Sequence, residues 1–325
     1  MTVPLLLFVY AAVLGVLGPR LRRATWPERA PRLAIVIWQA MSVSMVTALV
    51  LAGLTLAMPV QTIAGHVAHL VEACAHVLHG TTAGSGLATF PTIALVAAVG
   101  TVLWVVACVF AEVIRASLAR HRHAGALAIV GSYRADLGVT VVNDASAAIY
   151  CLPGRAPQVV TTSGALARLS PAHLQAALAH ERAHIAGRHD LVVAGAAALV
   201  RALPIVPLFA VAHEEVCRLV ELLADDAAGR HYDRMSVAGA LAHLADVSPP
   251  KVGLAAGGPS AVARVRRLTA PAHPLGIGQR LAGSALVTLV LCMPLALVAG
   301  PVVRAMESAY CEVPAIADHQ GAAHA

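Results

Sequence analysis

Residues 158–190 read QVVTTSGALARLSPAHLQAALAHERAHIAGRHD, a β-branched run followed by a long helical pattern. Ser170 and Pro171 are typical of a helix N-cap and of the first helical position, and Gly187 is typical of a helix end. The run before the helix predicts a strand. The capped helix contains the sequence HERAH.

The HERAH sequence indicates a metal site. Because residues four apart share one face of a helix, His180 and His184 can bind one ion. Glu181 is then placed to deprotonate a metal-bound water, whereas Arg182 points to the opposite helix face. A chance match is the alternative, because the chain has 16 histidines. The helix caps in the correct places argue against chance.

A catalytic zinc needs three protein ligands and one open position, so a third ligand must come from elsewhere. Residues 214–228 read EEVCRLVELLADDAA and predict a second helix from about His213 to Ala228. There Glu221 and Asp225 lie one turn apart, so one carboxylate can bind the metal while the other accepts the N–H of a ligand histidine. Taken alone, these acidic residues also fit a solvated helix face.

The composition is that of a membrane protein. Of the 325 residues, 58% are hydrophobic and 12% are charged, and the mean hydropathy is +0.75. These values exclude an ordinary soluble domain and a disordered chain. Runs long enough to cross a bilayer occur at about 2–18, 33–58, 90–114 and 281–303. We therefore expect four membrane spans around an internal domain at 115–280.

The arginines predict the orientation of these spans. The loop at 19–32 holds five arginines, whereas the loop at 59–89 holds no lysine or arginine. The positive-inside rule then puts 19–32 and 115–280 in the cytosol, and 59–89 and the short tail at 304–325 outside. Both termini are expected outside. Arginine in place of lysine and abundant alanine favour a bacterial cell, so the membrane is its inner or plasma membrane.

Within the internal domain, four short β-branched runs predict a small sheet, at 128–130, 139–142, 147–152 and 158–162. The later stretch 250–270 is rich in Gly, Pro and Ala and ends in three basic residues, Arg264, Arg266 and Arg267. It is interpreted as a linker with a juxtamembrane anchor.

The apolar stretch at 191–211 lies between the two predicted site helices. If it crossed the membrane once, His180 and Glu221 would lie on opposite sides and could not share an ion. Prolines and Arg201 interrupt the stretch. A shallow membrane-associated hairpin or an interfacial segment is therefore expected, with the site near the membrane surface.

Over about residues 125–235, the two quoted stretches resemble the gluzincin-type integral-membrane metallopeptidases of the BlaR/MecR family, and more distantly the HtpX and Ste24 peptidases. The resemblance implies a multi-pass α-helical membrane protein with a cytosolic α+β metallopeptidase domain. It implies one Zn²⁺ held by His180, His184 and Glu221, with Glu181 as general base and Asp225 in support.

The resemblance also implies how substrate is bound and what it is. A substrate strand would add to the sheet edge at 147–152 or 158–162. In the BlaR/MecR proteins, the protease acts after a signal on a cytosolic winged-helix repressor of the BlaI/MecI type, which relieves transcription of antibiotic-resistance genes. The expected partners are thus a protein substrate of this kind and the lipid bilayer, and an assembly of two copies is left open.

The chain departs from those receptors after its last span, where about 20 residues follow instead of a penicillin-binding sensor. Ser248 to Lys251 matches Ser-x-x-Lys by chance only, because two prolines lie between them. A signal could enter at the external segment 66–79. Its histidine stripe is either a pH or metal sensor or the wet face of an interfacial helix, and it comprises His66, His69, His76 and His79.

The same sequence features bear on several other functions. A quality-control protease of the HtpX type would use the same site, and a non-enzymatic receptor would keep the fold but have no need of Glu181. The spans carry few polar residues for a transporter. The arginines flank spans without interleaved aromatics, so direct nucleic-acid binding is not expected. The oxyanion donor stays open among His189, His231 and Tyr232.

Overall fold

The computed structural model describes residues 2–57, 89–154, 156–245, 261–271 and 274–311. It divides into two compact units, one of 1–12, 44–102 and 292–325 and one of 13–43 and 103–291. The second unit contains the candidate site. Three features of the sequence analysis lie outside the described residues: the histidine stripe of 66–79, the Ser248 to Lys251 match and the tail beyond 311.

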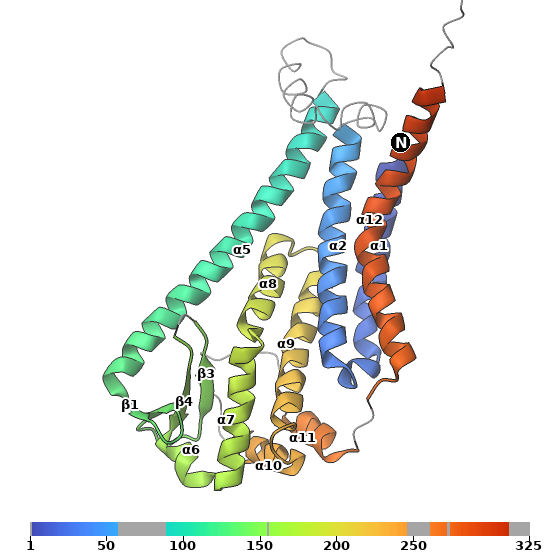
Figure 1. Cartoon of the computed structure of the whole chain (residues 1–325). Helices are drawn as coiled ribbons and strands as arrows, with labels where there is room; N and C mark the ends of the chain where they lie inside the picture. The colour runs from blue at the N-terminus through green and yellow to red at the C-terminus, as the bar shows by residue number, and fades with distance from the viewer. Residues whose placement is uncertain (1, 58–88, 155, 246–260, 272–273, 312–325) are drawn as a thin grey trace, which may run out of the picture. The chain divides into compact units, whose positions relative to one another are not determined.

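Four helices of the described part are long and apolar enough to cross a membrane, as expected from the sequence. They are α1 (Thr2–Leu17), α2 (Pro31–Ala57), α5 (Thr89–Val130) and α12 (Ile277–Cys311), seen as the long ribbons of Figure 1. The chain between α1 and α2 forms two short 3₁₀ helices, η1 (Gly18–Arg23) and η2 (Trp26–Glu28). This arrangement supports a membrane protein, while the side on which each loop lies stays a prediction.

The helix α5 is longer than the sequence led us to expect. It continues to Val130 instead of ending near 114, so the strand predicted at 128–130 is wrong and forms its last turn. A short apolar run does not distinguish a strand from a helix, and the alanines before it favour the helix. Arg115 does not close the helix either, because its side chain donates back to the carbonyl of Ala111 within it.

The sheet has four strands, β1 (Gly131–Arg134), β2 (Val139–Val142), β3 (Ile149–Leu152) and β4 (Gln158–Thr162), in the order β1-β2-β4-β3. The predictions for β2 and β4 are confirmed with their bounds, and β3 begins two residues later than expected. Strand β4 pairs with β2 in parallel and with β3 antiparallel. The candidate edge at 158–162 is therefore wrong, and β3 is the edge strand on that side.

Each face of the sheet packs on a helix. On one face, Leu178 of α7 joins a buried cluster with residues of β2 and β4, Val139 and Val159. On the other face, Leu127 of α5 packs with Leu152 and Val160. The alternation of side chains along β4 thus fixes the sheet between α5 and α7 (Pro171–Ala186).

Helix α7 has the caps that its sequence predicts. Ser170 Oγ accepts a hydrogen bond from the backbone N–H of His173 at 3.3 Å, Pro171 is the first helical residue and Gly187 follows the last. A short helix, α6 (Ser163–Arg168), precedes it.

Two further helices follow α7 and pack against each other, α8 (His189–Ala202) and α9 (Pro207–Ala228). The chain reverses between them at 203–206, so the stretch 191–211 forms a helix, a turn and the start of another helix (Figure 1). Helix α9 begins six residues before the expected 213, because Pro207 suits the first helical position. The HERAH helix α7 and helix α9 are thereby brought side by side.

Polar contacts attach α8 to α5. Arg201, which interrupts the apolar stretch, pairs with Glu112 at 2.9 Å. Near the end of α8, Trp104 Nε1 donates to the carbonyl of Ala202 at 2.9 Å. These bonds give partners to a charged side chain and to a carbonyl at the end of a helix.

Two helices, α10 (Arg234–Ala245) and α11 (Ala261–Thr269), complete the second unit. The expected linker at 250–270 is thus partly wrong, because nine of its residues, 261–269, form α11. The predicted anchor is wrong for Arg264, whose residue exposure is only 9%. The residues that Arg264 contacts belong to the candidate site described below.

Candidate metal centre

The structure brings His180, His184 and Glu221 together, although the third residue lies on another helix. Helices α7 and α9 are packed side by side, and one donor atom from each of the three residues lies within 4.8 Å of the others. The two Nε2 atoms are 3.1 Å apart. The Glu221 carboxylate oxygens lie 3.4 Å from His180 Nε2 and 3.5 Å from His184 Nε2.

These separations fit zinc. With zinc–ligand bonds of 2.0 to 2.1 Å at tetrahedral angles, neighbouring ligand atoms are about 3.4 Å apart. The three observed distances lie within a few tenths of an ångström of that value. Two imidazoles and a carboxylate are also the ligand types of catalytic zinc sites, which keep a fourth position open. His180, His184 and Glu221 are the residues that would hold the ion.

The far side of each imidazole has a hydrogen-bond partner. His180 Nδ1 donates to Asp225 Oδ1 at 3.0 Å, so in the neutral imidazole Nε2 is the nitrogen without a proton and can bind the ion. For His184 the partner is another imidazole, since its Nδ1 lies 3.0 Å from Nδ1 of His189. The buried His189 therefore lies behind a ligand, and an oxyanion role for it has no support here.

Arg264 reaches the site from α11, although the sequence pattern did not indicate it as a site residue. Its Nε donates to Asp225 Oδ2 at 2.8 Å, and its Nη1 lies 2.9 Å from Glu221 Oε2. A helical pattern could have revealed it, because Arg264 and Leu268 are four residues apart on the face that α11 buries.

The hydrogen bonds of His180 change its basicity. Burial by itself disfavours the imidazolium, but the hydrogen bonds that it donates to Asp225 and Glu221 outweigh burial and raise the pKa of His180 to about 9. Burial opposes the charge of Glu221 as well, yet its contacts with the histidines and Arg264 lower its pKa to about 2. The carboxylate ligand is thus ionised at neutral pH, while His180 must lose a proton to bind a metal.

For Glu181 and His184, burial decides the direction of the pKa shift. Burial is the largest influence on Glu181 and raises its pKa above the usual value for a carboxyl group, which makes its carboxylate a stronger base. Burial and the neighbouring charge of His180 lower the pKa of His184 to about 3, so that ligand is neutral at physiological pH.

The edge strand β3 runs beside this group. Cys151 of β3 interacts with Glu181, and burial followed by the charge of Glu181 raises the pKa of the thiol. The thiol is therefore protonated, and both it and the backbone N–H of Cys151 face the carboxylate. This contact places the edge of the sheet next to the proposed general base.

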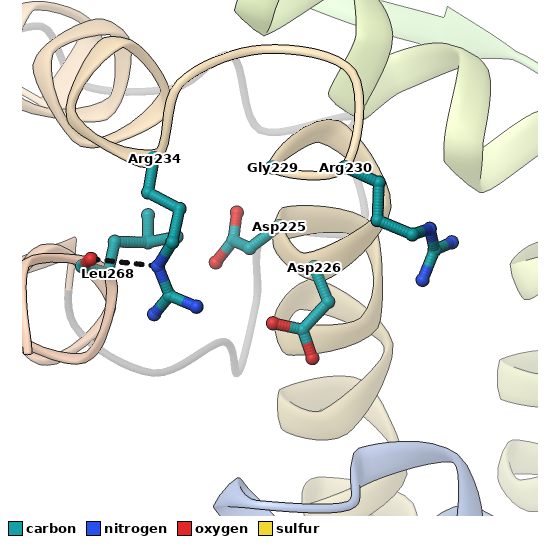
Figure 2. A pocket seen from close by; sticks show the side chains of 6 residues that line it. All are labelled: Asp225, Asp226, Gly229, Arg230, Arg234 and Leu268. Carbon is teal, nitrogen blue, oxygen red and sulfur yellow. Dashed lines mark hydrogen bonds between the residues drawn. The ribbon is translucent and has the colours of Figure 1, made fainter. Parts of the chain in front are cut away.

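A cavity of about 270 Å³ opens beside Asp225, where α9, α10 and α11 meet. Figure 2 shows Arg234 on one wall, with its Nε bonded to the carbonyl of Leu268 at 3.0 Å. Asp226 and Arg230 lie on the α9 side. The cavity lies between the helices that carry Asp225 and Arg264.

Comparison with known proteins gives one family. A family model described as Peptidase family M48 matches residues 116–211, which include the whole sheet, the HERAH helix and α8. No curated protein and no solved structure matches the chain. The match supports a zinc metallopeptidase of a membrane type at a coarse level. It ends before Glu221, so the site residues of α9 and α11 lie outside the matched residues.

Proposed function

We propose that this protein is a membrane-embedded zinc endopeptidase. The observation that carries the proposal is a three-residue cluster of His180, His184 and Glu221 that suits zinc, with Glu181 close enough for the charges of His180 and Glu221 to act on its pKa. The M48 match over the HERAH helix supports the same class.

The reaction would divide between the ion and the side chains. When bound, zinc supplies Lewis acidity that polarises the scissile carbonyl and lowers the pKa of water. Glu181 takes the proton of the attacking water and passes it to the leaving amine. Its raised pKa suits both transfers, because the carboxylate is a better base than an exposed one. Asp225 keeps His180 in the tautomer that has Nε2 free.

The substrate backbone would pair with β3. The amide of Thr162 donates to the carbonyl of Ala148 at 3.0 Å, and antiparallel pairing alternates along the strand. The N–H and C=O groups of Ile149 and Cys151 then point away from β4. A peptide that adds there lies beside Glu181 and is recognised largely by its backbone.

The substrate we propose is a cytosolic winged-helix repressor of the BlaI/MecI type, cut after a signal. This step rests on the resemblance to the BlaR/MecR family and on the expected cytosolic position of 115–280. A quality-control protease of the HtpX type has the same site and differs in its many membrane-protein substrates. A non-enzymatic receptor is disfavoured by the intact Glu181 beside the ligand cluster.

A comparison of new protein N-termini in host cells tests these functions. The cells would express the wild type, Glu181→Gln or, as a matched control, Asp136→Asn, whose carboxylate is exposed in a turn and pairs only with Arg134 among the described contacts. Fragments of one or a few regulators that vanish with Glu181→Gln alone support the signalling protease. Fragments of many membrane proteins favour quality control. Identical N-termini in all three cultures contradict a protease.

A further inference from the structure

Helix α11 carries one positive charge into the candidate metal centre. Arg264 is 9% exposed and contacts both Asp225 and Glu221. Asp225 is fully buried, and a buried carboxylate needs a charged or hydrogen-bonding partner. Arg264 is the guanidinium that meets this need, because it bonds both oxygens of Asp225.

The bidentate contact orients Asp225. With Oδ2 held by Arg264 Nε at 2.8 Å and Oδ1 by Nη2, the carboxylate is fixed in one plane. In that plane Oδ1 lies 3.0 Å from His180 Nδ1. The position of Arg264 therefore determines the position of a ligand imidazole, both through Asp225 and through its own Nη2, which lies 3.4 Å from each ring nitrogen of His180.

The charges also match. Glu181, Glu221 and Asp225 together carry three negative charges when ionised. A divalent ion and the single charge of Arg264 balance them. Without Arg264, the three carboxylates would face the ion with one charge in excess, and Asp225 would lose its bidentate partner.

Docking of α11 depends on residues that do not touch the metal ligands. Arg267 pairs with Asp226 at 2.8 Å, and its Nε donates to the backbone carbonyl of Glu28 at 2.9 Å. Glu28 belongs to η2, between the first two apolar helices, and its side chain lies 3.3 Å from Arg218 of α9. The chain at 26–28 thus holds α11 against α9.

The helix α10 holds the same C-terminal end of α11. Arg234 donates to the carbonyls of Leu268 and Arg267 at 3.0 and 2.8 Å, as Figure 2 shows for the first of them. Leu268 is buried in an apolar cluster with Val237 and Ala238 of α10. The contacts of Arg267, Arg234 and Leu268 all hold α11, the helix of nine residues that brings Arg264 to the site.

We propose that Arg264 is a positioning residue of the metal centre, and that the affinity of the centre for zinc is linked to docking of α11 on α9 and on the 26–28 segment. This inference rests on the zinc site of the proposed function. Linkage is reciprocal, so zinc binding must also stabilise the docked α11. Movement of the junction between the first two apolar helices would then change zinc affinity.

The first test measures zinc affinity of the full-length protein in detergent, by competition with a chromophoric chelator. Arg264→Gln should weaken binding about 10- to 100-fold, the range found when partners of metal-binding histidines are lost. Arg264→Lys should recover only part of the loss, because lysine cannot make the bidentate contact. Arg266→Gln is the matched control, since Arg266 is exposed on the same helix, and it should bind like the wild type.

The second test separates docking of α11 from the charge of Arg264. Arg267→Gln leaves every metal-ligand contact in place, yet should also weaken zinc binding, and amide exchange of 261–269 should slow on addition of zinc in the wild type. Unchanged affinity in both Arg264→Gln and Arg267→Gln would overturn the proposal, and a loss in Arg264→Gln alone would overturn the linkage to docking. A wild type that binds no zinc would instead contradict the proposed function.

Discussion

Asp225 Oδ1 lies 3.0 Å from Nδ1 of His180, and the same carboxylate is held on both oxygens by Arg264. One carboxylate thus links a ligand on the HERAH helix to an arginine 84 residues later in the chain. Because His180 Nδ1 is occupied, only Nε2 faces the other ligand atoms.

Replacing this carboxylate should harm both metal binding and stability. In Asp225→Ala, His180 loses the acceptor for its Nδ1–H, and zinc affinity should fall about 10- to 100-fold. The buried Arg264 loses its main partner as well, which should lower the free energy of unfolding by about 3 to 5 kcal/mol. Chelator competition and thermal denaturation in detergent measure the two effects. Asp136→Asn, at an exposed ion pair, should change neither.

Zinc affinity should rise with pH. Hydrogen bonds to Asp225 and Glu221 overcome burial and raise the pKa of His180 to about 9, so the metal-free site is protonated there at pH 7. Zinc must displace that proton, and the dissociation constant should fall about tenfold per pH unit from pH 7 to about 9. The stability of the metal-free protein should change with pH in the opposite direction. The raised pKa stabilises the metal-free fold below pH 6.5, and this contribution is lost as the pH rises through about 9.

Titration calorimetry in buffers of different ionisation enthalpies checks the pH dependence, because it counts the protons released on zinc binding. About one proton per ion is expected from His180 near pH 7.5. A dissociation constant that stays flat across this range would contradict the assignment of His180 as a ligand.

Local signals predicted the framework of the site well. Ser170, Pro171 and Gly187 fixed the HERAH helix because caps are set by nearby backbone groups. Strands β2 and β4 had the expected bounds, since both are β-branched and bounded by turn residues. Glu221 and Asp225 could be paired with the motif because their spacing is one helical turn.

The remainder depends on packing between distant segments. The end of α5 was misread because Ala128 to Val130 favours either a helix or a strand until Leu127 packs on the sheet. The edge strand could not be chosen, since strand order is set by pairing and not by composition. Arg264 looked like a membrane anchor because three basic residues in a row of four give a strong local signal, while its partners lie far away in sequence.

The imidazole behind His184 gives a further prediction. Loss of the His189 ring in His189→Ala should weaken zinc binding about tenfold, because His184 loses the partner that fixes its orientation. His243→Ala, on the exposed side of α10, is the control for loss of an imidazole and should bind zinc normally. Equal affinities in the two variants would show that the contact between the two Nδ1 atoms has no part in metal binding.

Gly187 should be sensitive for a related reason. A Cβ at this position would overlap the His189 ring, and the next residue, Arg188, already has a left-handed backbone with φ of 47°. Gly187→Ala should therefore displace His189 or the start of α8 and lower stability by about 1 to 3 kcal/mol. Gly195→Ala, in the middle of α8 with open space around it, should be neutral or slightly stabilising. Thermal denaturation of both variants in one detergent compares them directly.

A last prediction concerns the edge of the sheet. If substrate adds to β3, its backbone must pair with the outward N–H of Cys151 in place of the Glu181 carboxylate that this N–H faces, and proline at that position removes the donor while β4 keeps its own hydrogen bonds. Cys151→Pro should fold, bind zinc and lose at least tenfold in kcat/KM toward an extended peptide. Cys151→Ala is the control for the thiol and should retain most of the activity, because it keeps the N–H.

Tyr150→Pro tests the register of this edge. The N–H of Tyr150 points toward Val160 of β4, so its removal breaks the sheet itself and should destabilise the fold in a denaturation experiment.

Full peptidase activity in Cys151→Pro would mean that substrate approaches Glu181 by a route other than pairing with β3. Loss of zinc in that variant would mean instead that the edge strand supports the metal centre, since Cys151 interacts with the residue next to His180.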